Sequence, residues 1–507
     1  MKRYIRNSLG RILVILVAAV IEVFVLVSAF VWFYDKAAWI TLVLSISGIL
    51  ITLGIIKNSR HLSFDVVWIV LILLFPISGA IVYLFLGADL LISGTFKKIR
   101  RATEEAFKYY PRDNGVLQLA KEEYPQAKGQ FEYISTNTGF SFYKNRDFKY
   151  YGLGELGFPK MLQELRKAER FIFLEYFIID EGTMWGSILE ILEEKARQGV
   201  DVRVMYDDLG SFFLLPVNYF KTLENKGIKC VPFNRINPIL NIIINHRDHR
   251  KIMVIDGKVA FSGGINLADE YINRIHPYGK WKDNVIMIKG EAVWSYTVMF
   301  LMHWNALKPT DVDYNDFRVK TRSRKEDGYI APYGETPLDD EMSSQNIYLN
   351  ILNGAREYCY IFTPYLIIDT EMINTLILTA KRGVDVCLVT PGIPDKRIVF
   401  SITRSYYRQL IEGGVRIIEY TPGFVHSKVF VADDVVATVG TINLDYRSLY
   451  LHFENGTYIY GSKVIEEIRD DLLEAMKEGH EVSLEESKRP FLYEFVMAFL
   501  RLFAPLM

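Results

Sequence analysis

The sequence has few cysteines and almost no net charge. Its 507 residues contain three cysteines and no CxxC pair, so neither a disulfide framework nor a cysteine-based metal site is indicated. The formal net charge is −1, which gives no indication of nucleic acid as a partner. The cysteines lie in apolar runs typical of strands, where we expect small buried residues: Cys230, Cys359 and Cys387.

Charged residues are also nearly absent from three long runs before residue 90. Each run is long enough to cross a hydrocarbon layer of about 30 Å at about 1.5 Å per helical residue. None has the polar face that a soluble core helix would need, and Glu22 is the only charged residue among them. We therefore predict a multi-pass transmembrane region over residues 1–90, with spans near 12–34, 37–56 and 66–86.

The orientation of this region and the role of Glu22 stay open. Basic residues both precede the first run and follow the third. An odd number of spans puts these two basic clusters on opposite sides of the membrane, so they cannot both follow the positive-inside rule. Glu22 is either a functional group within the membrane or a partner for a neighbouring helix.

Beyond residue 130, short β-rich runs alternate with helical runs, and the order of these runs repeats. For example, Ala196–Val202 (ARQGVDV) closely matches Ala380–Val386 (AKRGVDV). A repeat this long indicates two copies of one domain rather than a solenoid. The alternation is typical of an α/β fold, and we expect mixed, mostly parallel sheets with helices on both faces. The predicted segments are a juxtamembrane linker (91–130), a first domain (131–310), a polar linker (311–345), a second domain (346–480) and an apolar tail (481–507).

Each predicted domain contains one His-x-Lys-x4-Asp motif, with an asparagine at the same distance downstream. The run after each lysine predicts a buried strand, on which residues i and i+2 point to one face, so each His and Lys project together. One match carries modest weight, but two with the same spacing in a duplicated domain indicate a shared site. The motif residues are His249, Lys251, Asp256 and Asn266 in the first domain and His426, Lys428, Asp433 and Asn443 in the second.

These paired motifs resemble the phospholipase D superfamily, and the whole chain is similar to the bacterial cardiolipin synthases within it. The similarity covers the apolar N-terminus, both domains and the apolar end, and Asn443–Leu449 (NLDYRSL) is especially close to the synthase pattern. One departure is His452, where these synthases often have asparagine. The resemblance implies two phospholipase D-like domains in a pseudo-two-fold arrangement, located at a bacterial cell membrane.

The residue types in the motifs suit phosphodiester chemistry in two steps. A neutral imidazole would form a phosphohistidine, and a second, protonated imidazole would protonate the leaving group. Lysine and asparagine side chains would hold the phosphate oxygens, and we expect neither a metal nor a cofactor. By resemblance, His249 is the nucleophile and His426 is the acid and then the base, although the pseudo-symmetry leaves the reverse assignment open.

The resemblance also assigns an orienting acid to each histidine, Asp283 in one copy and Glu454 in the other. Surface salt bridges are the alternative role for these two acids. Asp256 and Asp433 belong to the motif, but an aspartate at the end of a strand can also brace the site by hydrogen bonds without touching substrate.

The motifs do not identify the molecule that accepts the transferred phosphate group. The membrane region narrows the range of possible substrates. A site tethered to a bilayer meets lipid head groups at high effective concentration. We therefore predict phosphatidyl transfer between two phosphatidylglycerol molecules, giving cardiolipin and glycerol. The alternatives are a hydrolytic phospholipase D, a phosphatidylserine synthase, a membrane-tethered nuclease and an inactive scaffold. The expected partners are phospholipid and the bilayer, without nucleic acid, and the oligomeric state stays open. The end of the tail, 491–506, is either an interfacial segment or a buried helix.

Overall fold

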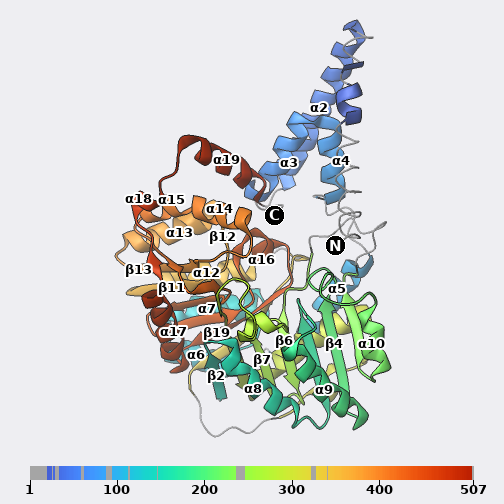
Figure 1. Cartoon of the computed structure of the whole chain (residues 1–507), viewed down its shortest axis with the longest axis vertical. Coiled ribbons are helices and arrows are strands. Elements are labelled where there is room, and N and C mark those ends of the chain that lie inside the picture. The colour runs from blue at the N-terminus through green and yellow to red at the C-terminus, as the bar shows by residue number, and fades with distance from the viewer. Residues whose placement is uncertain are drawn as a thin grey trace. The chain divides into compact units, whose positions relative to one another are not determined.

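The computed structural model describes residues 20–25, 27–28, 34–58, 62–86, 94–111, 115–145, 147–235, 246–320, 327–339 and 341–504. The chain forms two compact units, whose elements are labelled in Figure 1. The smaller unit contains the N-terminal helices and the end of the chain from Ala498, and the larger unit contains Gly94–Arg235 and Asn245–Met497.

The longest helix of the smaller unit is α2 (Tyr34–Asn58), which contains the predicted span at 37–56. Its window Thr41–Asn58 is long and apolar enough to cross a membrane, and within the described ranges no other helix meets this criterion. Most of the predicted first span, 12–34, lies outside the described residues.

The prediction of one continuous span at 66–86 is wrong, because two short helices fold back on each other there. α3 (Leu62–Leu74) and α4 (Pro76–Leu86) lie side by side (Figure 1), and the rings of Trp68 and Tyr83 pack edge to face with centroids 5.7 Å apart. In one straight helix these rings would be about 22 Å apart. The proline that begins α4 has no N–H with which to continue α3. Arms of 13 and 11 residues reach about 20 and 17 Å, which is too short to cross a bilayer.

Close contacts hold this helical hairpin together. A Cβ on Gly79 would lie 2.4 Å from the carbonyl oxygen of Leu71, so the approach of the two arms requires glycine. Glu22 is buried and accepts a hydrogen bond from Ser78 Oγ, which means that this acid pairs with a neighbouring helix. Phe503, near the end of the chain, packs against the same small core.

The apolar tail forms α19 (Phe491–Leu502), on which Met497 is the buried residue. Phe491, Leu492 and Phe495 are mostly exposed. Of the two alternatives for the tail, this exposure disfavours a buried C-terminal helix, and an interfacial segment stays a prediction.

In the larger unit, the first motif belongs to a sheet of seven strands among the described residues. β3, β4 and β5 are parallel to one another, and every other pair of neighbours is antiparallel. The strands in sheet order are β2 (Asp147–Tyr151), β9 (Val285–Lys289), β7 (Val259–Gly263), β6 (Lys251–Ile255), β3 (Phe171–Tyr176), β4 (Asp201–Asp207) and β5 (Lys229–Phe233). The helices of this copy are α8 (Gly154–Leu165), α9 (Thr183–Arg197), α10 (Tyr219–Asn225) and α11 (Val293–Leu307).

The second motif belongs to a sheet of nine strands, counted over the same described residues. The strands in order are β1 (Tyr143–Lys144), β10 (Tyr329–Glu335), β19 (Glu454–Tyr460), β17 (Val436–Gly440), β16 (Val429–Ala432), β11 (Tyr358–Phe362), β13 (Asp385–Pro391), β14 (Arg416–Tyr420) and β20 (His480–Glu481). The helices are α12 (Ser343–Gly354), α13 (Thr370–Lys381), α14 (Arg397–Ser405), α15 (Tyr407–Glu412), α16 (Tyr446–Tyr450), α17 (Val464–Glu478) and α18 (Leu484–Ser487). β11, β13 and β14 are the parallel part.

Both sheets are mixed, as predicted, but most neighbouring strands are antiparallel, so the expectation of mostly parallel sheets is wrong. The reason is the short connections around the motifs. Residues 256–258 join β6 to β7, and residues 433–435 join β16 to β17, whereas a parallel crossover needs about a dozen residues or more.

Two stretches that the sequence presents as linkers carry regular structure. Residues 329–335, within the expected polar linker, form β10 and pair with β19. The expected juxtamembrane linker contains α5 (Gly94–Ala106), α6 (Val116–Glu123) and the start of α7 (Lys128–Glu132).

Backbone pairing joins the two copies close to the motifs. β8 (Lys280–Lys282) of the first copy pairs in parallel with β15 (Gly423–Val425) of the second, and Asp248 forms an equivalent single bridge with Phe453. Each motif histidine directly follows one of these junctions, so the site lies where the two copies meet.

Candidate active site

The two motif histidines precede strands of different sheets, and each is held by backbone from the opposite copy. The N–H of His249, before β6, donates to the carbonyl oxygen of Phe453 at 2.9 Å. The N–H of His426, before β16, donates to the carbonyl oxygen of Lys282 at 2.8 Å. Each copy therefore holds the histidine of the other by a backbone hydrogen bond, and these bonds bring the two motifs into one site.

Each imidazole also contacts a carboxylate that belongs to the opposite copy. Nδ1 of His249 lies 2.9 Å from both carboxylate oxygens of Glu454, and Nδ1 of His426 lies 2.6 Å from Oδ2 of Asp283. Both acids are 0% exposed. Because a carboxylate accepts hydrogen bonds, the proton of each neutral ring is on Nδ1 and the lone pair is on Nε2. The acids expected to orient the histidines thus contact them directly and are not on the surface.

Burial keeps both imidazoles neutral at pH 7. Loss of solvation lowers the pKa of His249 well below its usual value, and neighbouring cations, above all Lys251, lower it further. Loss of solvation and Lys428 lower the pKa of His426 to about 4, although the attraction of Asp283 opposes this. The second, protonated imidazole expected from the sequence is therefore not present at neutral pH. A phosphate anion beside these rings would raise both pKa values by Coulomb attraction.

Both motif lysines are buried and fold back toward their own histidines. Lys251 Nζ donates to the carbonyl oxygen of His249 at 2.9 Å, and Lys428 Nζ donates to that of His426. Burial lowers the pKa of Lys251 to about 8 and the pKa of Lys428 to about 7. Their positive charges are therefore easily lost above neutral pH and would be stabilised by a bound anion.

The motif aspartates lie at the strand ends opposite the histidines. Asp256 accepts hydrogen bonds from the N–H groups of residues 169–171 at 2.7–3.0 Å, and Asp433 accepts from those of residues 356–358 at 2.8–2.9 Å. Both have left-handed backbone, with φ of 53° and 56°, which aspartate tolerates better than most residues. β6 separates Lys251 from Asp256 by about 16 Å. The structure therefore corrects their assignment as catalytic residues, because they brace the hairpin turns.

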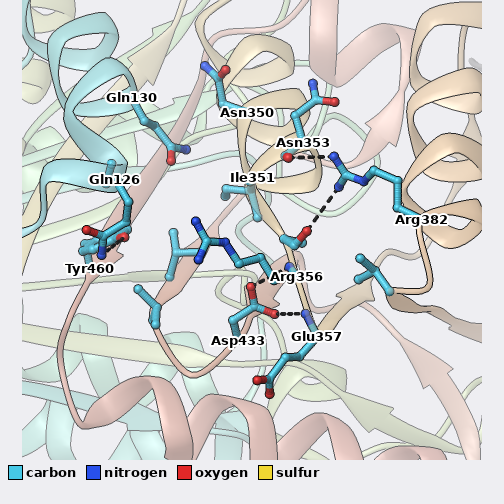
Figure 2. Close-up of a pocket in the computed structure, with 16 residues that line it drawn as sticks. Gln126, Gln130, Asn350, Ile351, Asn353, Arg356, Glu357, Arg382, Asp433 and Tyr460 are labelled. Carbon is cyan, nitrogen blue, oxygen red and sulfur yellow. Dashed lines mark hydrogen bonds between the residues drawn. The ribbon is translucent and has the colours of Figure 1, made fainter.

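A cavity of about 700 Å³ opens beside the Asp433 end of the second sheet (Figure 2). Figure 2 shows the Asp433 carboxylate directed at the backbone of Arg356 and Glu357 in the cavity wall. The described residues that line this cavity include neither motif histidine. The cavity is therefore separate from the histidine site.

The two asparagines expected to bind phosphate differ in their contacts. Asn266 accepts a hydrogen bond from the N–H of Ile178 at 3.0 Å and donates to Tyr271 Oη at 2.8 Å, so both ends of its amide are engaged. Asn443 is buried, and its Oδ1 has no hydrogen-bond partner within the described part of the chain. Of these two, Asn443 has the polar group that is not satisfied within the protein.

Two further asparagines support the site and were missed in the sequence. The side chain of Asn455 accepts from the N–H of Lys251 at 3.1 Å and donates to Ser262 Oγ at 2.8 Å. Asn284 accepts from the N–H of Gly264 at 3.3 Å. The available signal was that an asparagine directly follows the orienting acid in both copies.

A second aromatic ring lies beside each motif histidine, at the same offset from the orienting acid. The ring of His452 lies beside His249 with centroids 5.8 Å apart and planes at 42°. The ring of Trp281 lies beside His426 with centroids 5.5 Å apart and planes at 44°. The pseudo-symmetry thus extends to these rings, but one is an imidazole and the other an indole.

A cluster of buried ionic groups lies beside the first motif. Arg250 Nε is 3.3 Å from Glu175 Oε1 and 3.4 Å from Asp248 Oδ1, and His303 Nδ1 is 3.0 Å from the same Glu175 oxygen. Arg250 also contacts the ring of His303. Burial raises the pKa of Glu175, and hydrogen bonding to His303 and the charge of Arg250 hold the pKa of Asp248 low despite its burial. Arg250 therefore supplies the positive charge that two buried acids require.

Two groups of side chains have the spacing of a metal site among the described residues: Glu175, Asp248 and His303, and His249, His452 and Glu454. The first group already surrounds the Arg250 guanidinium, which occupies the place of a cation. The second group contains no such positive side chain among its three members.

Comparisons with known proteins agree with the arrangement of the two motifs. Residues 161–304 and 348–476 match the family model described as cardiolipin synthase, phospholipase D-like domain. The chain is 32% identical to a cardiolipin synthase of Halalkalibacterium halodurans over 92% of its length and 93% of that protein. It is 46% identical to an uncharacterized protein of Streptococcus mutans over 82% of its length and 91% of that protein. Among solved structures, the phosphatidylserine synthase of Haemophilus influenzae has the same fold, with a TM-score of 0.56, 14% identity and coverage of 72% of this chain and 95% of that one.

Proposed function

The chain belongs to the cardiolipin synthase family of phospholipase D-like proteins, and on this premise we propose that it is a phosphatidyltransferase that makes cardiolipin in a bacterial cell membrane. In the proposed reaction, one phosphatidylglycerol gives its phosphatidyl group to a hydroxyl of a second, and glycerol leaves. The observation that carries the proposal is the reciprocal pairing of His249 with Glu454 and of His426 with Asp283.

In the first step, Nε2 of His249 attacks phosphorus while the bond from phosphorus to the glycerol oxygen breaks. His426 Nε2 gives its proton to that oxygen, and a phosphatidyl-histidine forms. In the second step, a hydroxyl of another phosphatidylglycerol attacks phosphorus as His426 removes its proton. The phosphorus–nitrogen bond then breaks, which releases cardiolipin and returns both histidines to their starting forms.

The unequal environments of the two histidines support these roles. Lys251, Lys428 and His426 all oppose a positive charge on His249, so this ring suits a neutral nucleophile. The charge of Asp283 and its 2.6 Å hydrogen bond favour protonation of His426, which suits a general acid. The substrate phosphate supplies the further negative charge that protonation of this ring requires.

The lysines of both copies stabilise the charge of the phosphate. A phosphodiester carries one negative charge, and Lys251 and Lys428 are buried with each Nζ bonded to the backbone carbonyl of its own histidine. Nζ groups that turn from backbone carbonyls to phosphate oxygens would stabilise the charge that builds up in the transition state. The unsatisfied atom of Asn443 is Oδ1, an acceptor, which suits a hydroxyl of the lipid head group rather than a phosphate oxygen. Asn266 holds the backbone around the site.

The decisive experiment incubates the full-length protein with vesicles of labelled phosphatidylglycerol and analyses the products. We expect cardiolipin and glycerol in equal amounts. Phosphatidic acid as the sole product would reject the synthase in favour of a hydrolase. Transfer to added serine in preference to phosphatidylglycerol would favour a phosphatidylserine synthase, the activity named for the Haemophilus influenzae protein of this fold.

A further inference from the structure

His452 lies beside the pair formed by His249 and Glu454, but the proposed reaction does not use it. Its side chain is 10% exposed, and neither ring nitrogen has a hydrogen-bond partner among the described residues. Buried polar atoms without partners are rare and unfavourable, and at a functional site they point to a ligand. A neutral imidazole has one N–H donor and one lone pair, so a ligand here would accept a hydrogen bond or bind the lone pair.

The spacing around His452 is that of a metal site. One ligand atom each from His249, His452 and Glu454 lie within 4.8 Å of one another. His249 Nδ1 is 2.9 Å from Glu454, and His452 Nδ1 is 3.8 Å from Glu454 Oε1. A tetrahedral zinc ion with bonds of about 2.05 Å keeps its ligand atoms about 3.3 Å apart. The two spacings lie on either side of this value, and the third, between the two histidines, is at most 4.8 Å, so side-chain rotations would complete three ligand positions.

The surroundings hold this group in place. Thr441 Oγ1 donates a hydrogen bond to Glu454, which fixes the carboxylate in the way that outer partners fix metal ligands. The ring of Phe177 packs edge to face against His249 with centroids 5.0 Å apart and gives the group an apolar wall. Two imidazoles and one carboxylate are a donor set that zinc accepts, with a fourth position for water or another oxygen.

The other half of the site supplies a natural comparison. Trp281 has the place beside His426 that His452 has beside His249, with nearly the same ring geometry. An indole is not a metal ligand, and among the described residues His426 and Asp283 belong to no such group of three donors. The metal-binding arrangement therefore depends on the identity of one residue.

We propose that His249, His452 and Glu454 bind a divalent transition-metal ion of the zinc type and that binding inhibits the enzyme. The ion would take up the carboxylate of Glu454 and replace the proton on His249 Nδ1. That proton would move to Nε2, which would then lack the lone pair that attacks phosphorus. The nearby amines of Lys251 and Lys428 oppose a further cation, which makes binding reversible. The proposal does not depend on which lipid is the substrate, because zinc binding is measured directly.

The test uses the full-length protein in detergent, stripped with a chelator and then titrated with zinc chloride. Bound zinc is counted by equilibrium dialysis, and its ligands are identified by X-ray absorption at the zinc edge. Each preparation is also assayed for lipid transfer relative to its own zinc-free rate. We expect one zinc per chain with two imidazole ligands and loss of transfer over the same concentration range.

Three variants decide whether the ion binds at this site. His452→Asn should weaken zinc binding and inhibition together by at least about tenfold, since even partners outside the ligand shell are worth 10–100-fold. Trp281→His should add a second zinc equivalent by giving His426 and Asp283 a third donor. His480→Asn is the control, because His480 also contacts a carboxylate, Glu486, but lies on the surface.

The results separate clearly. Zinc affinity that falls in His452→Asn and stays at the wild-type value in His480→Asn supports the proposal. Equal zinc affinity in the wild type and His452→Asn would place the ion elsewhere and overturn it. Absence of bound zinc in the wild type would overturn it as well, whatever the lipid assay shows.

Discussion

The two half-sites have the same motif but different supports. The His249 half is backed by Arg250, Glu175 and Asp248, a buried network of charges. At the matching positions, the His426 half has Ser427, Phe362 and Val425 in place of these residues, all three buried. The acids also differ in their hydrogen bonds. Glu454 accepts from Thr441 as well as from its histidine, whereas Asp283 makes one short hydrogen bond to its histidine.

The difference indicates that duplication preserved the reacting groups and changed what surrounds them. Two identical half-sites would have two histidines of equal pKa, and neither would be preferred as nucleophile or acid. Here the cations around His249 oppose its protonation, and Asp283 assists the protonation of His426. An enzyme that needs one neutral and one protonated imidazole benefits from this inequality.

The largest effect is expected from replacing each histidine in turn. His249→Ala and His426→Ala should each lower transfer by about 10⁴-fold or more, as for residues that act as a unit. A phosphatidyl ester of p-nitrophenol separates them, because this leaving group departs without a proton. His426→Ala should still release a burst of p-nitrophenol and retain labelled lipid on His249, whereas His249→Ala should give no burst. The opposite pattern would exchange the two roles.

The second effect concerns the buried charges beside His249. Arg250→Met leaves Glu175 and Asp248 without their cation, and loss of one partner from a buried ionic group costs about 3–5 kcal/mol. Ser427→Ala removes the matching side chain of the other half, whose hydroxyl makes one weak hydrogen bond, at 3.4 Å, among the described residues. We expect a thermal unfolding midpoint several degrees lower for Arg250→Met and little change for Ser427→Ala. Equal shifts would mean that the charged network does not stabilise its half.

The third effect separates the two acids by pH. Activity requires neutral His249, which sets the rising limb of the pH profile, and protonated His426, which sets the falling limb. Removing a negative charge lowers the pKa of its histidine partner. Asp283→Asn should therefore move the falling limb to lower pH, and Glu454→Gln should move the rising limb to lower pH, each with about a 10²-fold lower maximum. Movement of the same limb in both variants would contradict the assigned roles.

The sequence predicts the duplication, the paired motifs and the mixed α/β domains well, because each leaves a local pattern. It does not predict that β8 pairs with β15 across the copies, since pairing between distant segments leaves no such pattern. The apolar run at 66–86 is long enough for a span, but hydropathy does not register that Pro76 ends one helix and that Gly79 lets two helices meet. In both cases, tertiary contacts determine a feature of the structure that amino-acid composition alone does not.

The site itself was predictable to a similar extent. His249, His426 and their lysines are recognised by spacing alone, and the acids came from a family resemblance. Their partners could not be derived from spacing, because His249 and Glu454 are 205 residues apart and belong to different copies. The functions of Asp256 and Asp433 were ambiguous for a physical reason, since the same residue type serves both as a catalytic acid and as a cap for backbone N–H groups.

The smallest effect is expected where the two halves are most alike. Asp256→Ala and Asp433→Ala each remove three hydrogen bonds to backbone N–H groups and a residue suited to positive φ. In each half, two of the three N–H groups belong to exposed residues, but the third belongs to buried Phe171 beside Asp256 and to half-buried Tyr358 beside Asp433. We expect a loss of about 2–3 kcal/mol for Asp256→Ala and about 1 kcal/mol for Asp433→Ala, because a buried unsatisfied donor is the more costly. Transfer rates of the folded variants should stay within a few-fold of wild type. A rate loss comparable to that of the histidine variants would return these aspartates to the catalytic set.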